Sequence, residues 1–236
     1  LLDLEDAKTD ADITLQVTGI QWKWKYTYVD EDVSFISSLA QSSRDVVNDP
    51  TGNENYLLEV DEPVVLPINK KVRFLFHSSD VIHAWWVPEL GVKQDSIPGF
   101  INDSWATIEK PGIYRGQCAE LCGKDHGFMP IVVNAVTEAE YQQWRVSKKV
   151  EAAAAAASAE QEWSMKDLLA QGETVYQANC SACHGPTGAG IPGAFPAMTG
   201  SPIVLGDAAG HIDIILNGKA GTAMAAFKGQ LNDVDI

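Results

Sequence analysis

The sequence has few basic residues and no long apolar run, and each of these shortages argues against a class of protein. Only 17 lysines and arginines stand against 32 aspartates and glutamates, a formal net charge of −15 that argues against nucleic-acid binding. No stretch of about 18 or more apolar residues is present, so we expect no bilayer-spanning helix, and no signal peptide is recognisable. The hydrophobic content of 45% excludes a disordered chain.

The acidic residues are unevenly placed. Residues 164–236 hold three basic and six acidic side chains, so the first 163 residues carry −12 of the −15 charge. An acidic face accelerates the approach of a basic protein partner. The competing interpretation is that the charge only maintains solubility. The length of 236 residues allows two modest domains with separate cores.

The richest concentration of metal-binding side chains is the run Cys118-Ala-Glu-Leu-Cys122-Gly-Lys-Asp-His126-Gly-Phe-Met129. Glycines and the following Pro130 interrupt it, which is typical of a loop rather than a helix. Thiolate, imidazole and thioether form a soft donor set that suits copper better than magnesium, calcium or manganese. A blue copper site needs one cysteine, whereas two cysteines can each bridge a pair of copper ions.

Simpler interpretations stay open for these residues. Cys118 and Cys122 can form a disulfide, or they can bind zinc together with His126. Zinc seldom recruits methionine, however, and the cysteines of a zinc pair usually stand closer together in sequence. Met129, taken alone, is more typical of an ordinary core methionine.

Three separated segments, in the same order, resemble cytochrome c oxidase subunit II. Residues 116–130 resemble the binuclear copper (CuA) loop of that family, Asp80–Gly91 resembles the segment with its remaining histidine ligand, and Gly19–Tyr26 resembles its aromatic run. The match covers most of residues 12–145. The resemblance implies two copper ions (CuA) held by His83, Cys118, Glu120 through its main-chain carbonyl, Cys122, His126 and Met129.

The resemblance implies two further roles. The Glu120 carboxylate is expected to reach a magnesium ion at the border with subunit I. The simpler interpretation is that Glu120 is a solvated acid on a loop. Trp22 matches the surface residue through which that family receives electrons from cytochrome c. The aromatic residues of 22–28 alternate and so share one face of a strand, and a packed aromatic face is the competing interpretation. Ile20 departs from the family, which usually has histidine there.

The first domain is predicted to consist of strands. Apolar and polar residues alternate in 13–17 and in Lys71–His77, the period of half-buried strands. Seven or eight short strands with turn residues between them predict an all-β Greek-key sandwich or barrel, and the family resemblance implies the cupredoxin-like version. Residues 30–54 are expected to form a long surface excursion, and His77 to be exposed. The other strand candidates are Tyr56–Val60, Val64–Ile68, Ile82–Val87, Trp105–Ile108, Gly112–Gly116 and Met129–Val136.

A linker follows. Glu138–Lys149 is predicted to form a closing helix whose Tyr141, Trp144 and Arg145 pack back on the strands. The Ala-rich run 151–160 has high helix propensity but no large apolar face, so we expect a tether in the form of a lone or frayed helix. The predicted organisation is a copper domain in 1–145, an Ala-rich linker in 146–163 and an all-α cytochrome c domain in 164–236.

The second domain carries the attachment signature of a c-type haem, Cys180-Ser-Ala-Cys183-His184. Both thiols of this signature add to the haem vinyl groups, and the adjacent imidazole ligates the iron. A redox-active or zinc-binding cysteine pair is the alternative. Ser164–Asp167 matches a capping box for the helix that leads into the signature. Residues 172–176 and Gly185 around it resemble a class I cytochrome c.

Class I cytochromes usually take methionine as the second axial ligand. Met224 matches the ligand loop of that family better than Met198, so the resemblance assigns Met224 to the iron. His211 begins a predicted helix over 211–216 and is expected to be exposed. Asn232–Asp235 has the pattern of an N-terminal helix cap, but the sequence stops before the helix that would follow. Class I cytochromes pack a C-terminal helix across their first helix. We therefore expect this haem domain to be less stable than related domains that have that helix.

Together these resemblances imply that the sequence is the soluble part of a subunit II of a caa-type cytochrome c oxidase, with its electron donor fused to it. The N-terminal membrane hairpin of that family is not expected in this sequence. Electrons are expected to pass from an external donor, such as a soluble cytochrome c, to the haem on His184, then to the copper pair, then to subunit I. The chain is expected to have no catalytic residue of its own. Cysteine-bound metals predict the periplasmic side of the bacterial cytoplasmic membrane.

Two other functions stay open. The electron-accepting module of a nitrous oxide or nitric oxide reductase shares the copper loop, although the oxidase-like segments Gly19–Tyr26 and Asp80–Gly91 disfavour it. A copper-delivery or storage protein needs no covalent haem, so Cys180–His184 argues against it.

Overall fold

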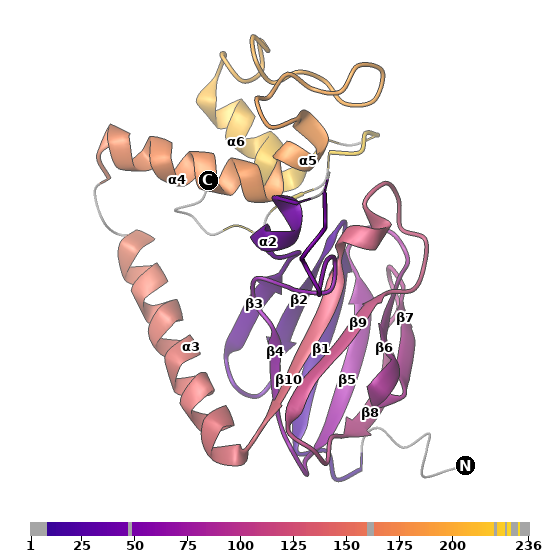
Figure 1. Ribbon diagram of the computed structural model, residues 1–236. Helices are drawn as coiled ribbons and strands as arrows, with labels where there is room; N and C mark the ends of the chain where they lie inside the picture. The colour runs from indigo at the N-terminus through magenta and orange to yellow at the C-terminus, as the bar shows by residue number, and fades with distance from the viewer. Residues whose placement is uncertain are drawn as a thin grey trace. The chain divides into compact units, whose positions relative to one another are not determined.

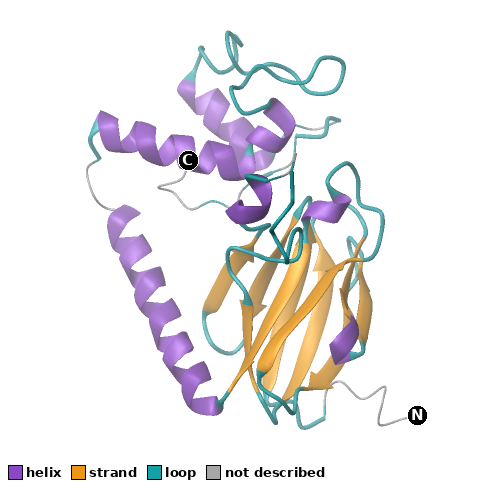
Figure 2. Cartoon of the chain, viewed as in Figure 1, coloured by secondary structure: helices purple, strands orange, loops and turns teal. Residues whose placement is uncertain are grey.

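The computed structural model describes residues 9–46, 49–159, 163–219, 221–224, 226–227 and 231. The chain divides into two compact units, Leu1–Glu151 and Ala152–Ile236. The described strands, orange in Figure 2, belong to the first unit, and the helices after residue 160 belong to the second. The helix cap predicted at Asn232–Asp235 lies outside the described residues.

The first unit is a sandwich of two five-stranded sheets (Figure 1). The strand order is β3-β2-β1-β5-β8 in one sheet and β4-β10-β9-β6-β7 in the other. Most neighbouring strands are antiparallel, but β1 pairs with β5 and β10 pairs with β4 in parallel. The strands are β1 Ile13–Ile20, β2 Lys23–Tyr28, β3 Val33–Ser37, β4 Val64–Pro67, β5 Lys71–Ser78, β6 His83–Val87, β7 Val92–Ser96, β8 Asn102–Thr107, β9 Gly112–Cys118 and β10 Pro130–Val136.

The core lies between the sheets, and the alternation of the sequence explains it. Leu15 and Val17 of β1 are opposite Phe74 and Phe76 of β5 in the ladder, and all four side chains are completely buried. Burying a side chain of this size contributes about 1.5–3 kcal/mol, so these two strands anchor the sandwich. The predicted strands over 13–17 and 71–77 are therefore confirmed. The aromatic residues of β2 that join this core are Trp24, Tyr26 and Tyr28.

The described residues form ten strands, where seven or eight were predicted. Tyr56–Val60 is not a strand, because Val60 makes only an isolated bridge. The excursion predicted for 30–54 contains β3, which pairs with β2, and the one-turn helix α2 (Gln41–Arg44). The polar strand β7 has no sequence signal of its own and forms by pairing with β6.

Helix α3 (Glu138–Ala159) begins on the first unit and continues through the Ala-rich segment. Tyr141 is buried, and Trp144 packs on Tyr28 with ring centroids 5.0 Å apart. Arg145 forms an ion pair of 2.7 Å with a glutamate of the β2–β3 turn. These contacts confirm that the helix packs back. The Ala-rich segment is helical, as its helix propensity predicts, and its residues 151–157 are exposed, but it continues the preceding helix and is not a separate one.

Besides the end of α3, the described residues of the second unit form three helices. Helix α4 (Met165–Asn179) has Ser164 as its N-cap, and the Ser164 hydroxyl accepts the N–H of Asp167 at 3.2 Å, which is the first of the two bonds of the predicted capping box. Among the described helices, none is both long and apolar enough to cross a bilayer. The remaining helices are α5 Ser181–His184 and α6 Ala208–Asn217 in this unit, and the 3₁₀ helices η1 Pro88–Leu90 and η2 His126–Phe128 in the first.

His77 and His211 are less exposed than predicted, since both are half-buried. The Nδ1 atom of His77 lies 3.2 Å from the carbonyl oxygen of Phe100, in the loop that follows β7. His211 lies inside α6 rather than at its start, because the helix begins at an Asp207 cap whose carboxylate accepts main-chain N–H groups of the first turn.

Candidate metal centre

Strand pairing in the second sheet brings together the two halves of the predicted copper site. β9 ends at Cys118, β6 begins at His83, and the two strands pair antiparallel with Trp85 opposite Cys118. The N–H of Ala119 continues this pairing by donating to the carbonyl of Ala84 at 2.9 Å. An imidazole and a thiol that lie 35 residues apart in sequence therefore become neighbours.

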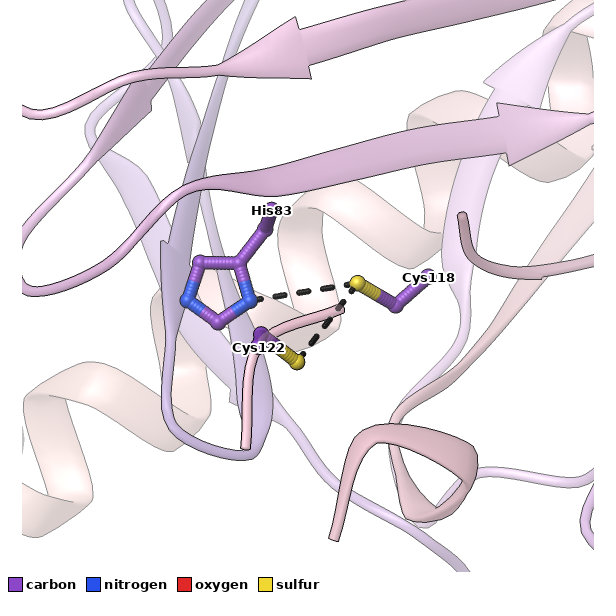
Figure 3. Close-up of side chains that lie close together, drawn as sticks. All are labelled: His83, Cys118 and Cys122. Atoms are coloured by element: carbon purple, nitrogen blue, oxygen red, sulfur yellow. Dashed lines mark hydrogen bonds between the residues drawn. The ribbon is translucent and has the colours of Figure 1, made fainter. Parts of the chain in front are cut away.

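The Cys118 thiol lies at the centre of this arrangement. Figure 3 shows the side chains of His83, Cys118 and Cys122 pointing toward one another. The Sγ atom of Cys118 lies 3.8 Å from Sγ of Cys122 and 3.9 Å from Nδ1 of His83. The main-chain oxygen of Glu120 lies 3.4 Å from the same sulfur, while the Glu120 side chain is exposed.

The Cys122 thiol has a matching set of neighbours. Its Sγ atom lies 3.4 Å from Nδ1 of His126 and 3.5 Å from Sδ of Met129. Each thiol therefore has one imidazole beside it, and each has one weaker donor, a carbonyl oxygen or a thioether. The structure thus brings together all six residues that the resemblance named as copper ligands.

The site is shielded from solvent. The exposed fraction is 0% for His83, 1% for Met129, 2% for Cys122 and 6% for Cys118, while His126 is half-buried. Electrostatic interactions between the donor atoms are therefore much stronger than they would be in water.

The hydrogen bond between the two thiols shifts their pKa values in opposite directions. The hydrogen bond from Cys122 lowers the pKa of Cys118 to about 3 against the opposing effect of burial, and His83 adds to this effect. The same hydrogen bond, with burial, raises the pKa of Cys122. A second thiolate 3.8 Å from the first would cost about 4 kcal/mol at an effective dielectric constant of about 20. Both sulfurs can therefore ionise together only beside a cation, so this pair suits a metal.

Asp80 orients His83, a role that sequence reasoning missed. Its Oδ1 atom accepts the Nε2–H of His83 at 2.9 Å, which leaves Nδ1 facing Cys118. Burial alone would lower the pKa of His83, but the bonds to Asp80 and Cys118 raise it. Carboxylates commonly fix metal-binding histidines in this way. The only sequence signal was the position of Asp80, three residues before His83 in the oxidase-like segment.

The geometry of the cysteine pair distinguishes between a disulfide, a zinc site and a copper site. The sulfur atoms of Cys118 and Cys122 are 3.8 Å apart and carry free thiols, whereas a disulfide needs about 2.05 Å. The cluster His83, Cys118 and Cys122 has donor atoms within 4.8 Å of one another. A thioether and a carbonyl oxygen complete the set, which favours copper over a tetrahedral zinc site.

Trp22 lies in the turn between β1 and β2 and is half-buried. Its indole Nε1–H donates to the carbonyl oxygen of Cys122 at 3.2 Å. The other aromatic residues of the run behave differently, because Trp24, Tyr26 and Tyr28 are completely buried. The packed aromatic face accounts for those three residues, whereas Trp22 packs against the same core and also bonds directly to the cysteine loop.

The haem signature of the second unit lies at the junction of two helices. Cys180 caps the end of α4, and Cys183 and His184 belong to α5; both cysteines are half-buried. The Nδ1 atom of His184 lies 2.9 Å from the carbonyl oxygen of Pro196. Since a carbonyl only accepts, Nδ1 must carry the proton, and the lone pair of Nε2 is left for a metal. These residues therefore fit a covalently attached haem.

The two candidate methionines are both half-buried. Met198 donates its N–H to the carbonyl of Gly188 at 2.8 Å, and Met224 accepts the N–H of Lys219 at 3.0 Å. These contacts belong to the main chain and leave both thioethers as candidates for the haem iron.

A two-sheet sandwich in which the loop after β9 presents two thiols, an imidazole and a thioether, and β6 adds a second imidazole, defines a cupredoxin-like copper domain. Residues 13–136 match the family described as cytochrome c oxidase subunit II, periplasmic domain. The chain belongs to this cytochrome c oxidase subunit II family. Residues 167–236 match a second family, described as cytochrome c oxidase, cbb3-type, subunit III.

Similar proteins carry the same description. The probable cytochrome c oxidase subunit 2 of Rickettsia bellii is 43% identical over 144 residues, which cover 61% of this chain and 52% of that protein. The corresponding protein of Rickettsia conorii is 44% identical over 137 residues, 58% of this chain and 42% of that protein. The chain thus spans about half the length of the relatives it matches.

Solved structures of such domains are similar to this one. The periplasmic domain of subunit II of cytochrome oxidase (CoxB) of Bradyrhizobium japonicum is 42% identical, with a TM-score of 0.53 over 60% of this chain and 96% of that one. A subunit II domain solved as a mixed disulfide intermediate with the thioredoxin-like protein TlpAs is 40% identical, with a TM-score of 0.52 over 63% of this chain and 98% of that one.

Proposed function

We propose that the chain is the electron-accepting part of a subunit II of a caa-type cytochrome c oxidase. In this proposal a copper domain, residues 1–145, is joined by the linker 146–163 to a cytochrome c domain, residues 164–236. The observation that carries the proposal is the convergence of two imidazoles, a thioether and a carbonyl oxygen on a pair of buried thiols. The matches of 13–136 and 167–236 support the same combination.

The copper site is proposed to hold two copper ions, which supply a one-electron redox couple when bound. The chain contributes donors fixed before any metal arrives. Cys118 ends a strand, His83 begins one, and Met129 immediately precedes another. Donors anchored on strands move little, so this arrangement suits electron transfer with small geometry changes. The proposed ligands are His83, Cys118, the carbonyl of Glu120, Cys122, His126 and Met129.

The haem site is proposed to hold one haem c, which supplies a second one-electron couple when bound. Cys180 and Cys183 would attach it, and His184 would offer Nε2 because Pro196 holds its Nδ1–H. Met224 is proposed as the second axial ligand. Methionine in that position raises the reduction potential, which suits a domain that receives electrons from an external donor.

The proposed partners are subunit I of a haem-copper oxidase and an external donor such as a soluble cytochrome c, on the periplasmic side of the membrane. The exposed Glu120 carboxylate is proposed to reach a magnesium ion shared with subunit I. Trp22 is proposed as the point where electrons reach the copper domain, since its indole bonds to the carbonyl of Cys122. The matched family and relatives support this interpretation and not a nitrous oxide reductase.

The experiment that tests the proposal uses the reduced, metal-loaded chain and a subunit I preparation that contains haem a. We expect the haem a absorption to show reduction when the two are mixed, and the acidic first unit to make the rate fall with rising salt. A chain that carries both metals yet leaves haem a oxidised, while reducing a nitrous or nitric oxide reductase, would overturn the assignment to an oxidase.

A further inference from the structure

The turn Gln21–Trp22 between β1 and β2 touches both segments that carry the proposed copper ligands. The main-chain N–H of Gln21 donates to Oδ2 of Asp80 at 2.7 Å. The other oxygen of the same carboxylate accepts the Nε2–H of His83. One end of Gln21 is therefore connected to the imidazole half of the site through Asp80.

The other end of Gln21 is connected to the thiol half. Its side-chain Nε2–H donates to the carbonyl oxygen of Cys122 at 2.7 Å, and the indole of Trp22 donates to the same oxygen at 3.2 Å. Two donors on one carbonyl fix the orientation of the peptide that follows Cys122. Because the thiol is attached to the same residue, this peptide also sets the position of its sulfur.

Two glycines allow this close approach. A Cβ atom on Gly19 would lie 2.6 Å from Cδ2 of His83, so strand β1 passes directly against the imidazole ring. Gly123 has φ +115°, and a Cβ atom there would lie 2.9 Å from Nε2 of Gln21. Any larger residue at 123 would displace the Gln21 amide from the Cys122 carbonyl, so the hydrogen bond depends on glycine at that position.

We propose that Gln21 is a positioning residue that fixes the separation between the imidazole and thiol halves of the copper site. It reaches across 59 residues to Asp80 and across 101 residues to Cys122, and it holds both segments from a single turn. It touches no proposed ligand atom and acts through Asp80 and the Cys122 carbonyl. This inference rests on one part of the proposed function, which is that the six donors bind copper.

The test replaces Gln21 by methionine, which has the same length but no N–H donor. The apo chain is titrated with Cu(II) ions against a competing chelator, and the electron resonance of the loaded chain is recorded. We expect Gln21→Met to bind copper about tenfold more weakly and to change the copper hyperfine splitting. Gln117→Met is the matched control, because Gln117 precedes Cys118 but its side chain is exposed; it should leave both readouts unchanged.

The outcomes separate this inference from the proposed function. Failure of the unmodified chain to bind copper would overturn the proposed function. Copper binding and splitting equal to those of the unmodified chain in Gln21→Met would overturn only the role of Gln21. If Gln21→Met does not fold, as judged by circular dichroism of the apo chain, Gln21→Glu is used instead. Glutamate keeps the shape of the glutamine side chain but places a carboxylate against the Cys122 carbonyl. Gln21→Glu should therefore weaken copper binding more than tenfold. Unchanged copper binding in Gln21→Glu would refute the inference.

Discussion

Asp80 and His83 form a directional pair in which the carboxylate takes the Nε2–H of the imidazole at 2.9 Å and turns Nδ1 toward Cys118. The carboxylate is itself held, because Oδ1 also accepts the N–H of Val81 at 2.7 Å. The ring orientation therefore exists before metal binding.

Replacing Asp80 by alanine should weaken copper binding by about 10–100-fold, because the imidazole loses the group that fixes its tautomer and orientation. Chelator competition on the purified chain measures the effect. Asp80→Asn is the matched variant, since its amide oxygen can still accept the Nε2–H, and its loss should be smaller. Equal affinities for Asp80→Ala and the unmodified chain would show that the pair has no part in metal binding.

Replacing Cys118 by serine should abolish the hyperfine pattern of one electron shared by two coppers, because the sulfur proposed to bridge the metals is lost. Electron resonance of the copper-loaded variant makes the measurement. Ser96→Ala is a suitable control, because Ser96 is also buried and lies opposite His83 in the β6–β7 ladder. Survival of the shared-electron pattern in Cys118→Ser would contradict the bridging role.

Replacing Met224 by alanine should remove the sulfur-to-iron absorption band of the oxidised haem domain and lower its reduction potential, since methionine ligation raises that potential. Optical spectroscopy and a redox titration of the haem-loaded chain give the readouts. Met198→Ala is the control and should keep the band. Loss of the band in Met198→Ala, with its retention in Met224→Ala, would reverse the assignment.

The stability of the first unit should fall in alkaline solution. Burial raises the pKa of Tyr26, Tyr28 and Tyr141 in the folded chain, whereas tyrosines of the unfolded chain ionise near pH 10. The protonated hydroxyls contribute their full stabilisation below about pH 10. This stabilisation is lost as the pH rises above that value. The free energy of unfolding should then fall by about 1.4 kcal/mol per pH unit for each tyrosine.

Urea unfolding at a series of pH values tests this, with Tyr28→Phe as the diagnostic variant. The Tyr28 hydroxyl donates to the carbonyl of Val65 at 2.7 Å and accepts its N–H at 3.1 Å. Its removal should cost about 1–3 kcal/mol at neutral pH and make the alkaline fall shallower. A fall of the same slope in Tyr28→Phe would mean that this hydroxyl is not one of the groups responsible.

The parts of the structure that were predicted from the sequence are those with a local signal. Alternation identified β1 and β5, and the spacing of Cys118, Cys122 and His126 identified the metal loop. The edge strands β3 and β7 have a neighbour on one side only and little apolar pattern. Pairing with β2 and β6 creates them, so a local pattern could not reveal them.

The supports of the metal site were missed for a related reason. Asp80 and Gln21 act through hydrogen bonds that exist only once three segments of the chain have come together. A glutamine before a tryptophan carries no signal of its own. The length of α3 was misjudged because its alanines were treated apart from the helix that precedes them.

The most direct test of the account is a count of copper and iron per chain, made together with one electron resonance spectrum of the oxidised chain. We predict two copper ions and one haem iron per chain, with hyperfine structure from both coppers on a single electron. One zinc ion at His83, Cys118 and Cys122, or a disulfide between the two cysteines with no metal bound, would contradict it.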